Sequence, residues 1–203
     1  MDDCVVIALF RHGLTIANKR KAYLGWSDSS LCEEAKDLKT HHRYHCYFAS
    51  DLKRCLDTAK ILFPHTNPYR LTELREMNFG DWEGKTYEIL KNDPQYCQWL
   101  TNPVIHSPPN GESFQQFTQR VQGGWRKITE EVLAKPIDHC AVITHGGVIR
   151  YLLSQFAPEE KEFWSWQVPH EHGFELIFDR EMLRGGNRCT SLQVVPLMGN
   201  DFG

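Results

Sequence analysis

The sequence predicts an α/β fold, built on a largely parallel central sheet with helices on both faces. Short apolar runs rich in β-branched residues alternate along the chain with segments whose apolar residues recur every three or four positions. This alternation is typical of parallel sheets with both faces covered. One pattern occurs twice: a buried strand ends in histidine and glycine before a helix, in residues 4–18 and again in residues 139–156.

In the first part of the chain we expect three strands and two helices. Ser30 and Glu33 have the spacing of a capping box and indicate a helix start. A second helix is predicted over residues 50–63, because its apolar residues share one face, with Ser50 or Asp51 as its N-cap. Three short apolar runs predict strands: residues 5–10, 45–50 and 69–74.

The rest of the chain continues the alternation. Residues 79–84 and 101–112 have the composition of loops, the second with three prolines and a glycine. A long amphipathic helix is predicted from Ser113, and a strand followed by a helix over residues 139–156. The tail predicts two more strands, at residues 174–179 and 190–195. No repeat or low-complexity linker interrupts the chain, so we expect a single domain.

Composition indicates a cytoplasmic protein. The chain has 23 Lys and Arg against 26 Asp and Glu, so no global field favours nucleic acid or a membrane surface as partner. Its longest apolar runs are six or seven residues, too short to span a bilayer. Seven scattered cysteines, with no CxxC pair, favour reduced thiols over a disulfide framework. We expect a monomer or a homodimer.

Three separate segments place polar side chains at the predicted ends of strands. Arg11 and His12 follow the first strand directly, and His145 follows a later one. Arg54 comes four residues after Ser50, at the end of a third. Because ligands of open α/β sheets bind beyond the carboxyl ends of the strands, we expect these groups to converge at one edge.

Six short blocks resemble, in order, the signature blocks of the histidine phosphatase superfamily, in its phosphoglycerate-mutase-like branch. "RHG" alone is a weak signal, whereas six blocks in order are specific. The resemblance implies one three-layer sandwich domain over residues 1–203, and phosphoryl transfer through a phosphohistidine. The blocks are "FRHGLTIAN", "YLGWSDSSL", "SDLKRCLDTA", "LREMNFGDWEG", "NGES" and "ITHGGVIR".

The residue types at the predicted edge suit a phosphoryl group on physical grounds. A phosphoryl dianion needs positive charge around its nonbridging oxygens and a nucleophile in line with the leaving group. Arg11 and Arg54 carry planar, always-charged donors for those oxygens, and His145 adds another. His12 is then the candidate nucleophile, and the nearby cations are expected to favour its neutral, reactive form.

The resemblance also implies the remaining site residues. Glu76 is implied as the general acid that protonates the leaving oxygen, ahead of Asp81 and Glu83 in the same block. The sequence departs from the family at Leu14, where Glu or Gln is usual, and this change bears on the orientation of Arg11 or on the far end of the substrate. The implied substrate-binding residues are Thr15, Asn18, Gly25 and Gly146.

Residues 92–119 favour a phosphatase over a mutase. They contain no Lys or Arg, whereas a mutase must hold a second phosphate. We therefore expect hydrolysis of a small phosphorylated metabolite. The length and blocks resemble α-ribazole phosphatases and broad-specificity phosphatases equally. Two alternatives stay open: a cofactor-dependent phosphoglycerate mutase whose tail holds the second phosphate, and a noncatalytic module that binds phosphorylated ligands.

Three further features bear on the site or the fold. The segment "HHRYHC" at residues 41–46 has metal-ligand residue types, but we expect a solvated loop there and predict no metal or other cofactor. Arg75 is expected to pair with a carboxylate rather than with phosphate. Gly123 and Gly124 lower the stability of the long predicted helix, and the sequence suggests only close packing or a bend as their reason.

Overall fold

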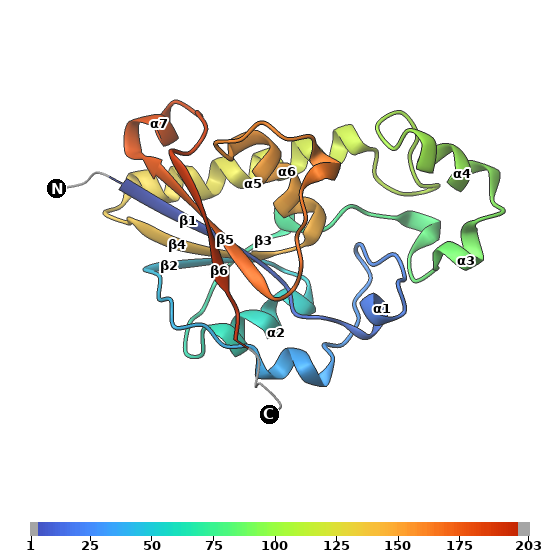
Figure 1. The fold of residues 1–203 in the computed structure, drawn as a ribbon, viewed down its shortest axis with the longest axis horizontal. Helices are drawn as coiled ribbons and strands as arrows, with labels where there is room; N and C mark the ends of the chain where they lie inside the picture. The colour runs from blue at the N-terminus through green and yellow to red at the C-terminus, as the bar shows by residue number, and fades with distance from the viewer. Residues whose placement is uncertain (1–3, 199–203) are drawn as a thin grey trace.

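A six-stranded mixed sheet lies at the centre of the computed structural model, which describes residues 4–198 (Figure 1). The strand order is β3-β2-β4-β1-β5-β6. The first four of these run parallel to one another, whereas β5 is antiparallel to β1, and β6 to β5. The predicted, largely parallel α/β fold is confirmed. The strands are β1 Cys4–Arg11, β2 Cys46–Ser50, β3 Tyr69–Leu71, β4 His139–Thr144, β5 His172–Asp179 and β6 Ser191–Pro196.

Helices cover both faces of the sheet, as predicted. Figure 1 shows α5 (Phe114–Ala134) and α6 (Gly146–Phe156) on one face and α2 (Lys53–Leu62) on the other. Side chains of β1 alternate between the two cores: Val5, Ile7 and Leu9 pack on the α5 and α6 side, and Ala8 and Phe10 pack on the α2 side. This two-sided burial explains the nearly continuous apolar run in the sequence.

A smaller aromatic core lies to one side of the sheet, where α3 (Tyr87–Leu90) and α4 (Pro94–Thr101) extend the molecule (Figure 1). It is built from Trp82, Leu90, Tyr96 and Trp99. No helix within residues 4–198 combines the length and hydrophobicity that a membrane crossing needs. The remaining elements are α1 Ile16–Lys19, α7 Arg180–Arg184 and the 3-10 turns η1 Glu33–Asp37, η2 Thr72–Leu74, η3 Gly80–Trp82 and η4 Phe163–Ser165.

Both predicted helix caps in the first part of the chain are wrong. The chain is still extended at Ser30 and Leu31, where the Ser30 carbonyl accepts the amide of Ile16 at 3.1 Å and Leu31 pairs with Thr15. The 3-10 turn η1 follows in place of the predicted α-helix. Helix α2 begins after Leu52, with no side-chain cap from its own segment. Its first amide, that of Lys53, donates instead to Asp28 from a distant loop, at 3.1 Å.

The two glycines in α5 have different surroundings, and only one needs to be glycine. A Cβ at Gly124 would lie 2.9 Å from Cβ of Glu73, whereas a Cβ at Gly123 meets no described atom within 4 Å. Close packing therefore explains Gly124 and leaves Gly123 as a helix-weakening residue at an open position.

We expect Gly123→Ala to raise the free energy of unfolding by about 0.5–1 kcal/mol, because alanine loses less backbone entropy in a helix. Gly124→Ala should lower it by about 1–3 kcal/mol, since overpacking forces α5 away from Glu73. Urea denaturation of the two variants measures both effects. Equal changes in the same direction would contradict this difference in packing.

Candidate active site

The carboxyl ends of β1, β2 and β4 meet at one edge of the sheet. These strands are parallel, and Arg11 of β1 lies in register with Thr144 of β4. The amide of His12 donates to the Thr144 carbonyl at 2.9 Å, which extends the pairing by one residue. The structure thus brings Arg11, His12, Ser50 and His145 together from three segments.

The imidazole of His12 is held in one orientation and one tautomer. Its side chain is buried, and Nδ1 lies 2.8 Å from the carbonyl oxygen of the next residue, Gly13. A carbonyl oxygen can only accept, so Nδ1 carries the proton of the neutral ring and Nε2 keeps its lone pair. The amide of Gly13 in turn donates to Thr58 of α2 at 2.9 Å, which anchors this turn.

The electrostatic surroundings keep this imidazole neutral. Burial lowers the pKa of His12 well below its usual value, and the charges of Arg54 and Arg11 lower it further. We expected the arginines to lower this pKa, whereas in the structure burial lowers it more than either arginine does. A neutral imidazole with a free lone pair is the nucleophilic form of histidine.

Each of the two arginines keeps part of its guanidinium group unpaired. Arg11 donates through Nη1 to the carbonyl of Val168 at 2.7 Å. Arg54, which is fully buried, donates to the carbonyls of Gly25 at 2.5 Å and Ser27 at 2.7 Å. The Nε atoms of both arginines are shielded from solvent and have no hydrogen-bond partner among residues 4–198. Because buried donors are normally satisfied, these two unpaired N–H groups are candidate donors to an anionic ligand.

His145 lies beside His12, with 5.2 Å between the ring centroids. Its Nε2 is 2.9 Å from the hydroxyl of Ser50, which accepts the amide of Leu52. The Ser50 proton is therefore free to donate to Nε2, which would leave the proton of the neutral His145 ring on Nδ1. Burial, followed by the charge of Arg54, lowers the pKa of His145 well below its usual value.

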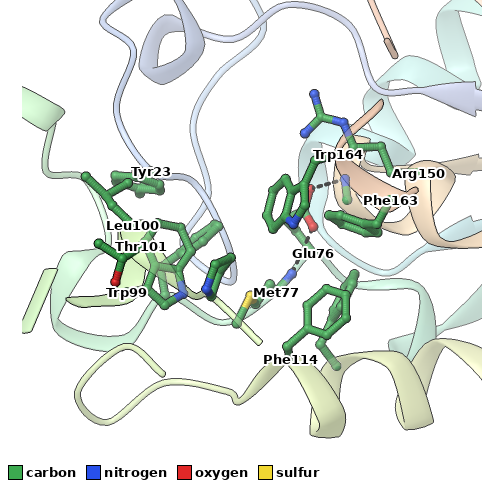
Figure 2. Close-up of a pocket in the computed structure, with 14 residues that line it drawn as sticks. Tyr23, Glu76, Met77, Trp99, Leu100, Thr101, Phe114, Arg150, Phe163 and Trp164 are labelled. Carbon is green, nitrogen blue, oxygen red and sulfur yellow. Dashed lines mark hydrogen bonds between the residues drawn. The ribbon is translucent and has the colours of Figure 1, made fainter. Parts of the chain in front are cut away.

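Glu76 lies at the wall of a cavity of about 540 Å³ (Figure 2). Its carboxylate accepts the amide of Gly147, at the start of α6, at 2.9 Å and that of Met77 at 3.0 Å. The walls are largely aromatic, and Phe163 and Trp164 line the same cavity as Glu76 (Figure 2). Of the predicted catalytic residues, Glu76 is the one that lines this cavity, whereas His12, Arg54 and His145 are almost completely shielded from solvent.

Two further arginines, Arg120 and Arg75, stabilise the segment that carries Glu76. Arg120 of α5 donates to the backbone carbonyls of Glu73, Arg75 and Glu76 at 2.9–3.1 Å, and to both carboxylate oxygens of Glu112. Arg75 binds both oxygens of Asp51, so it pairs with a carboxylate as the sequence indicated. These bonds hold the Glu76 backbone against α5.

Asp81 and Glu83, the two alternative general acids, lie in surroundings that differ from those of Glu76. Glu83 accepts the backbone amides of four residues, which ties two loops together: Gly25, Trp26, Ser27 and Phe79. Asp81 is exposed and accepts the side-chain amide of Asn110 at 3.0 Å. Neither lines the cavity beside Glu76.

The predicted substrate-binding residues lie around the site, largely as supports for other groups. Thr15 is buried and forms a capping box with Asn18 at the start of α1. Gly25 accepts from Arg54, and a Cβ there would lie 2.2 Å from both Glu83 and the Met77 carbonyl. A Cβ on Gly146 would lie 3.3 Å from the Arg11 guanidinium.

The sequence did not indicate His170, and it indicated Gly147 only as a glycine that lets the backbone approach a phosphate. His170 donates from Nδ1 to the His12 carbonyl at 2.7 Å, and burial together with Arg11 lowers its pKa to about 4. It comes from the loop before β5, and no motif marks it. Gly147 binds Glu76, and a Cβ there would lie 2.3 Å from Oε1. The second glycine of "THGG" was the available signal for it.

Guanidinium and imidazole groups gathered at the carboxyl edge of a parallel sheet suit a phosphoryl anion, and this places the chain in the broad class of α/β phosphoryl-transfer enzymes. Within that class, the chain belongs to the histidine phosphatase superfamily (branch 1), whose family model matches residues 7–182. The family indicated by the six sequence blocks is confirmed.

Individual relatives agree with this assignment. An adenosylcobalamin/alpha-ribazole phosphatase of Salmonella typhimurium is 32% identical over 158 residues, which cover 72% of this chain and 77% of that protein. A phosphoglycerate mutase structure from Thermus thermophilus is 31% identical, with a TM-score of 0.64 and coverage of 85% of this chain and 92% of that one. The alpha-ribazole phosphatase structure from Shigella flexneri, 24% identical over 95% and 96% of the chains, supports the fold with a TM-score of 0.81.

Proposed function

We propose that the protein hydrolyses the phosphomonoester of a small metabolite through a phosphohistidine on Nε2 of His12. The observation that carries this proposal is the hydrogen bond from Nδ1 of His12 to the Gly13 carbonyl, which directs the ring's lone pair to Nε2 beside two arginines with unpaired Nε donors. A neutral nucleophile among fixed cations is what attack on a phosphoryl dianion requires.

The reaction takes two steps. In the first, Nε2 of His12 attacks phosphorus, the bond to the alcohol oxygen breaks, and Glu76 gives that oxygen a proton. In the second, water attacks phosphorus, the phosphorus–nitrogen bond breaks, and Glu76 takes a proton from the water. Arg11, Arg54 and His145 hold the nonbridging oxygens throughout.

The cavity beside Glu76 would hold the alcohol part of the substrate. Aromatic side chains form much of its wall, and Arg150 is the one cation among the described lining residues. An apolar, ring-bearing alcohol fits such walls better than a second phosphate does. Together with the relatives named as alpha-ribazole phosphatases, this favours α-ribazole 5'-phosphate as the substrate and disfavours the mutase alternative.

The proposal also covers the location of the protein and its cofactor requirement. All seven cysteines are free, which supports a cytoplasmic location. The residues that would bind the phosphoryl group carry their own positive charge, so we propose hydrolysis without a metal or another cofactor. The monomeric or homodimeric state remains a prediction.

Turnover of p-nitrophenyl phosphate tests hydrolysis directly, and we expect activity that exhaustive chelation leaves unchanged. A panel of α-ribazole, sugar, nucleoside, serine and glycerate phosphates should then rank ring-bearing alcohols highest. Interconversion of phosphoglycerate isomers would show a mutase, and binding without turnover would show a noncatalytic module. Activity that falls on chelation and returns only with a divalent ion would contradict metal-free hydrolysis.

A further inference from the structure

A second group of chemistry-bearing side chains lies at the opposite edge of the sheet. His45 directly precedes β2, and Asp138 and His139 lie at the start of β4. The two strands are parallel neighbours, and the amide of His45 donates to the His139 carbonyl at 2.9 Å. These residues therefore share the amino edge of the sheet, whereas the candidate active site occupies the carboxyl edge.

The three side chains converge. One nitrogen of each imidazole and one oxygen of Asp138 all lie within 4.8 Å of one another. Nδ1 of His45 is 2.6 Å and Nδ1 of His139 is 3.2 Å from the same oxygen, Oδ1 of Asp138. His45 and His139 are exposed and Asp138 is half-buried, so solvent could complete the coordination of an ion held between them.

Asp138 contacts both histidines, and these contacts leave one of its oxygens without a well-oriented hydrogen bond. Oδ1 of Asp138 is itself shielded from solvent and has no hydrogen bond of acceptable geometry among the described residues, although Nδ1 of His45 and Nδ1 of His139 lie 2.6 Å and 3.2 Å from it. A buried carboxylate oxygen is normally satisfied. Three potential ligand atoms this close together, one of them an unsatisfied carboxylate oxygen, suit a shared metal ion.

The ligand types select the kind of ion. Two imidazoles and one carboxylate suit Zn²⁺ and similar borderline transition-metal ions, whereas Mg²⁺ and Ca²⁺ prefer oxygen ligands alone. Bonds of about 2.0–2.2 Å to a tetrahedral zinc place neighbouring ligand atoms a little more than 3 Å apart. The exposed side chain of His45 can open its 2.6 Å separation to that value by a small rotation.

We propose that His45, Asp138 and His139 form a surface site for Zn²⁺ or a similar divalent transition-metal ion, completed by water, which links the starts of β2 and β4. The sequence has metal-ligand residue types at residues 41–46, for which we expected a solvated loop and no metal, and the proposed site uses only His45 of these. His42 contacts Glu175 on β5 instead, and Cys46 is buried in the sheet. Asp138 and His139 come from a segment almost a hundred residues later in the chain.

We expect the proposed metal site to change the stability of the fold and not the turnover of the enzyme. An ion bound to the native fold and not to the unfolded chain stabilises the fold in proportion to its occupancy. At a free zinc concentration about a hundred times the dissociation constant, the midpoint of thermal unfolding should rise by about 5–10 °C. Turnover should not change, because the site lies at the edge of the sheet opposite to His12.

Isothermal titration of metal-free enzyme with Zn²⁺, together with thermal unfolding, tests the proposal. We expect one site in wild type that is lost in both His45→Gln and His139→Gln, and a rise in the unfolding midpoint that disappears with it. His41→Gln is the matched control, since it removes an exposed histidine of the same segment and should leave binding intact. Zinc binding in His45→Gln and His139→Gln equal to wild type would overturn the proposal, as would a wild type that binds no zinc.

Discussion

His12→Ala should lower turnover by roughly a thousandfold or more and abolish the covalent intermediate, because it removes the proposed nucleophile and nothing else in the site can replace it. Nε2 of His145 accepts from Ser50 and its Nδ1 carries the ring proton, so neither nitrogen of His145 has a free lone pair for the attack. His170 binds the backbone carbonyl of residue 12 through Nδ1, and this bond survives the substitution. It keeps the His170 ring in its own position, 5.5 Å from the place of the His12 ring.

Rapid quench of wild type with labelled substrate measures the intermediate. A phosphohistidine contains a phosphorus–nitrogen bond, so the label should be lost in acid and retained on alkaline denaturation. His41→Ala, which changes an exposed histidine, should behave as wild type in both assays. Label that is stable in acid would show that another residue is the nucleophile, and full label in His12→Ala would show the same.

Glu76→Gln should slow hydrolysis of an alkyl phosphate by about a hundredfold or more and affect p-nitrophenyl phosphate much less. An alkoxide leaves poorly and needs the proton of a general acid, whereas nitrophenolate leaves almost without one. The turnover of the two substrates by wild type and variant gives the measurement. The same loss for both would show that Glu76 holds the site together instead of donating a proton.

Gly147→Ala tests the same role with the carboxyl group still present. The new Cβ would lie 2.3 Å from Oε1 of Glu76, so the carboxyl group must move out of its position. We expect the leaving-group pattern of Glu76→Gln in a milder form. Gly123→Ala, at an open position of α5, is the matched control and should leave both substrates unaffected.

Substitutions of the neighbouring carboxylates, Asp81 and Glu83, separate proton donation from structural support of the site. Asp81→Asn changes an exposed side chain and should leave turnover of both substrates unchanged. Glu83→Gln should slow both substrates equally, because Glu83 holds the backbone of Gly25, whose carbonyl accepts from Arg54. A leaving-group effect in Asp81→Asn would assign the general acid to Asp81.

Much of the fold and most of the candidate site could be predicted from local patterns. The strands β1, β2 and β4 are buried on both faces, so their apolar runs are visible in the sequence. Because parallel strands end at the same edge, polar residues that follow such runs must come close together. That geometry suffices to place Arg11, His12, Ser50 and His145 beside one another.

Residues that act across long separations could not be predicted in this way. The N-terminal amide of α2 is bound by Asp28 from another loop, and Gly124 is required by Glu73 from a distant turn. Neither relation follows a helical or strand period, because each depends on which segments pack together. Local propensity therefore suggested a cap within the α2 segment where the folded chain uses a side chain from elsewhere.

The sequence by itself determined the sheet, its carboxyl edge and the residues that the edge displays, because two-residue and three- to four-residue periods are properties of short segments. Only the tertiary structure decided that β5 runs antiparallel to β1, and this direction brings His170 beside His12. It also decided the tautomer of His12 and the aromatic cavity beside Glu76. These features depend on contacts between residues far apart in the chain, whose positions are set by packing of the whole molecule and not by local sequence.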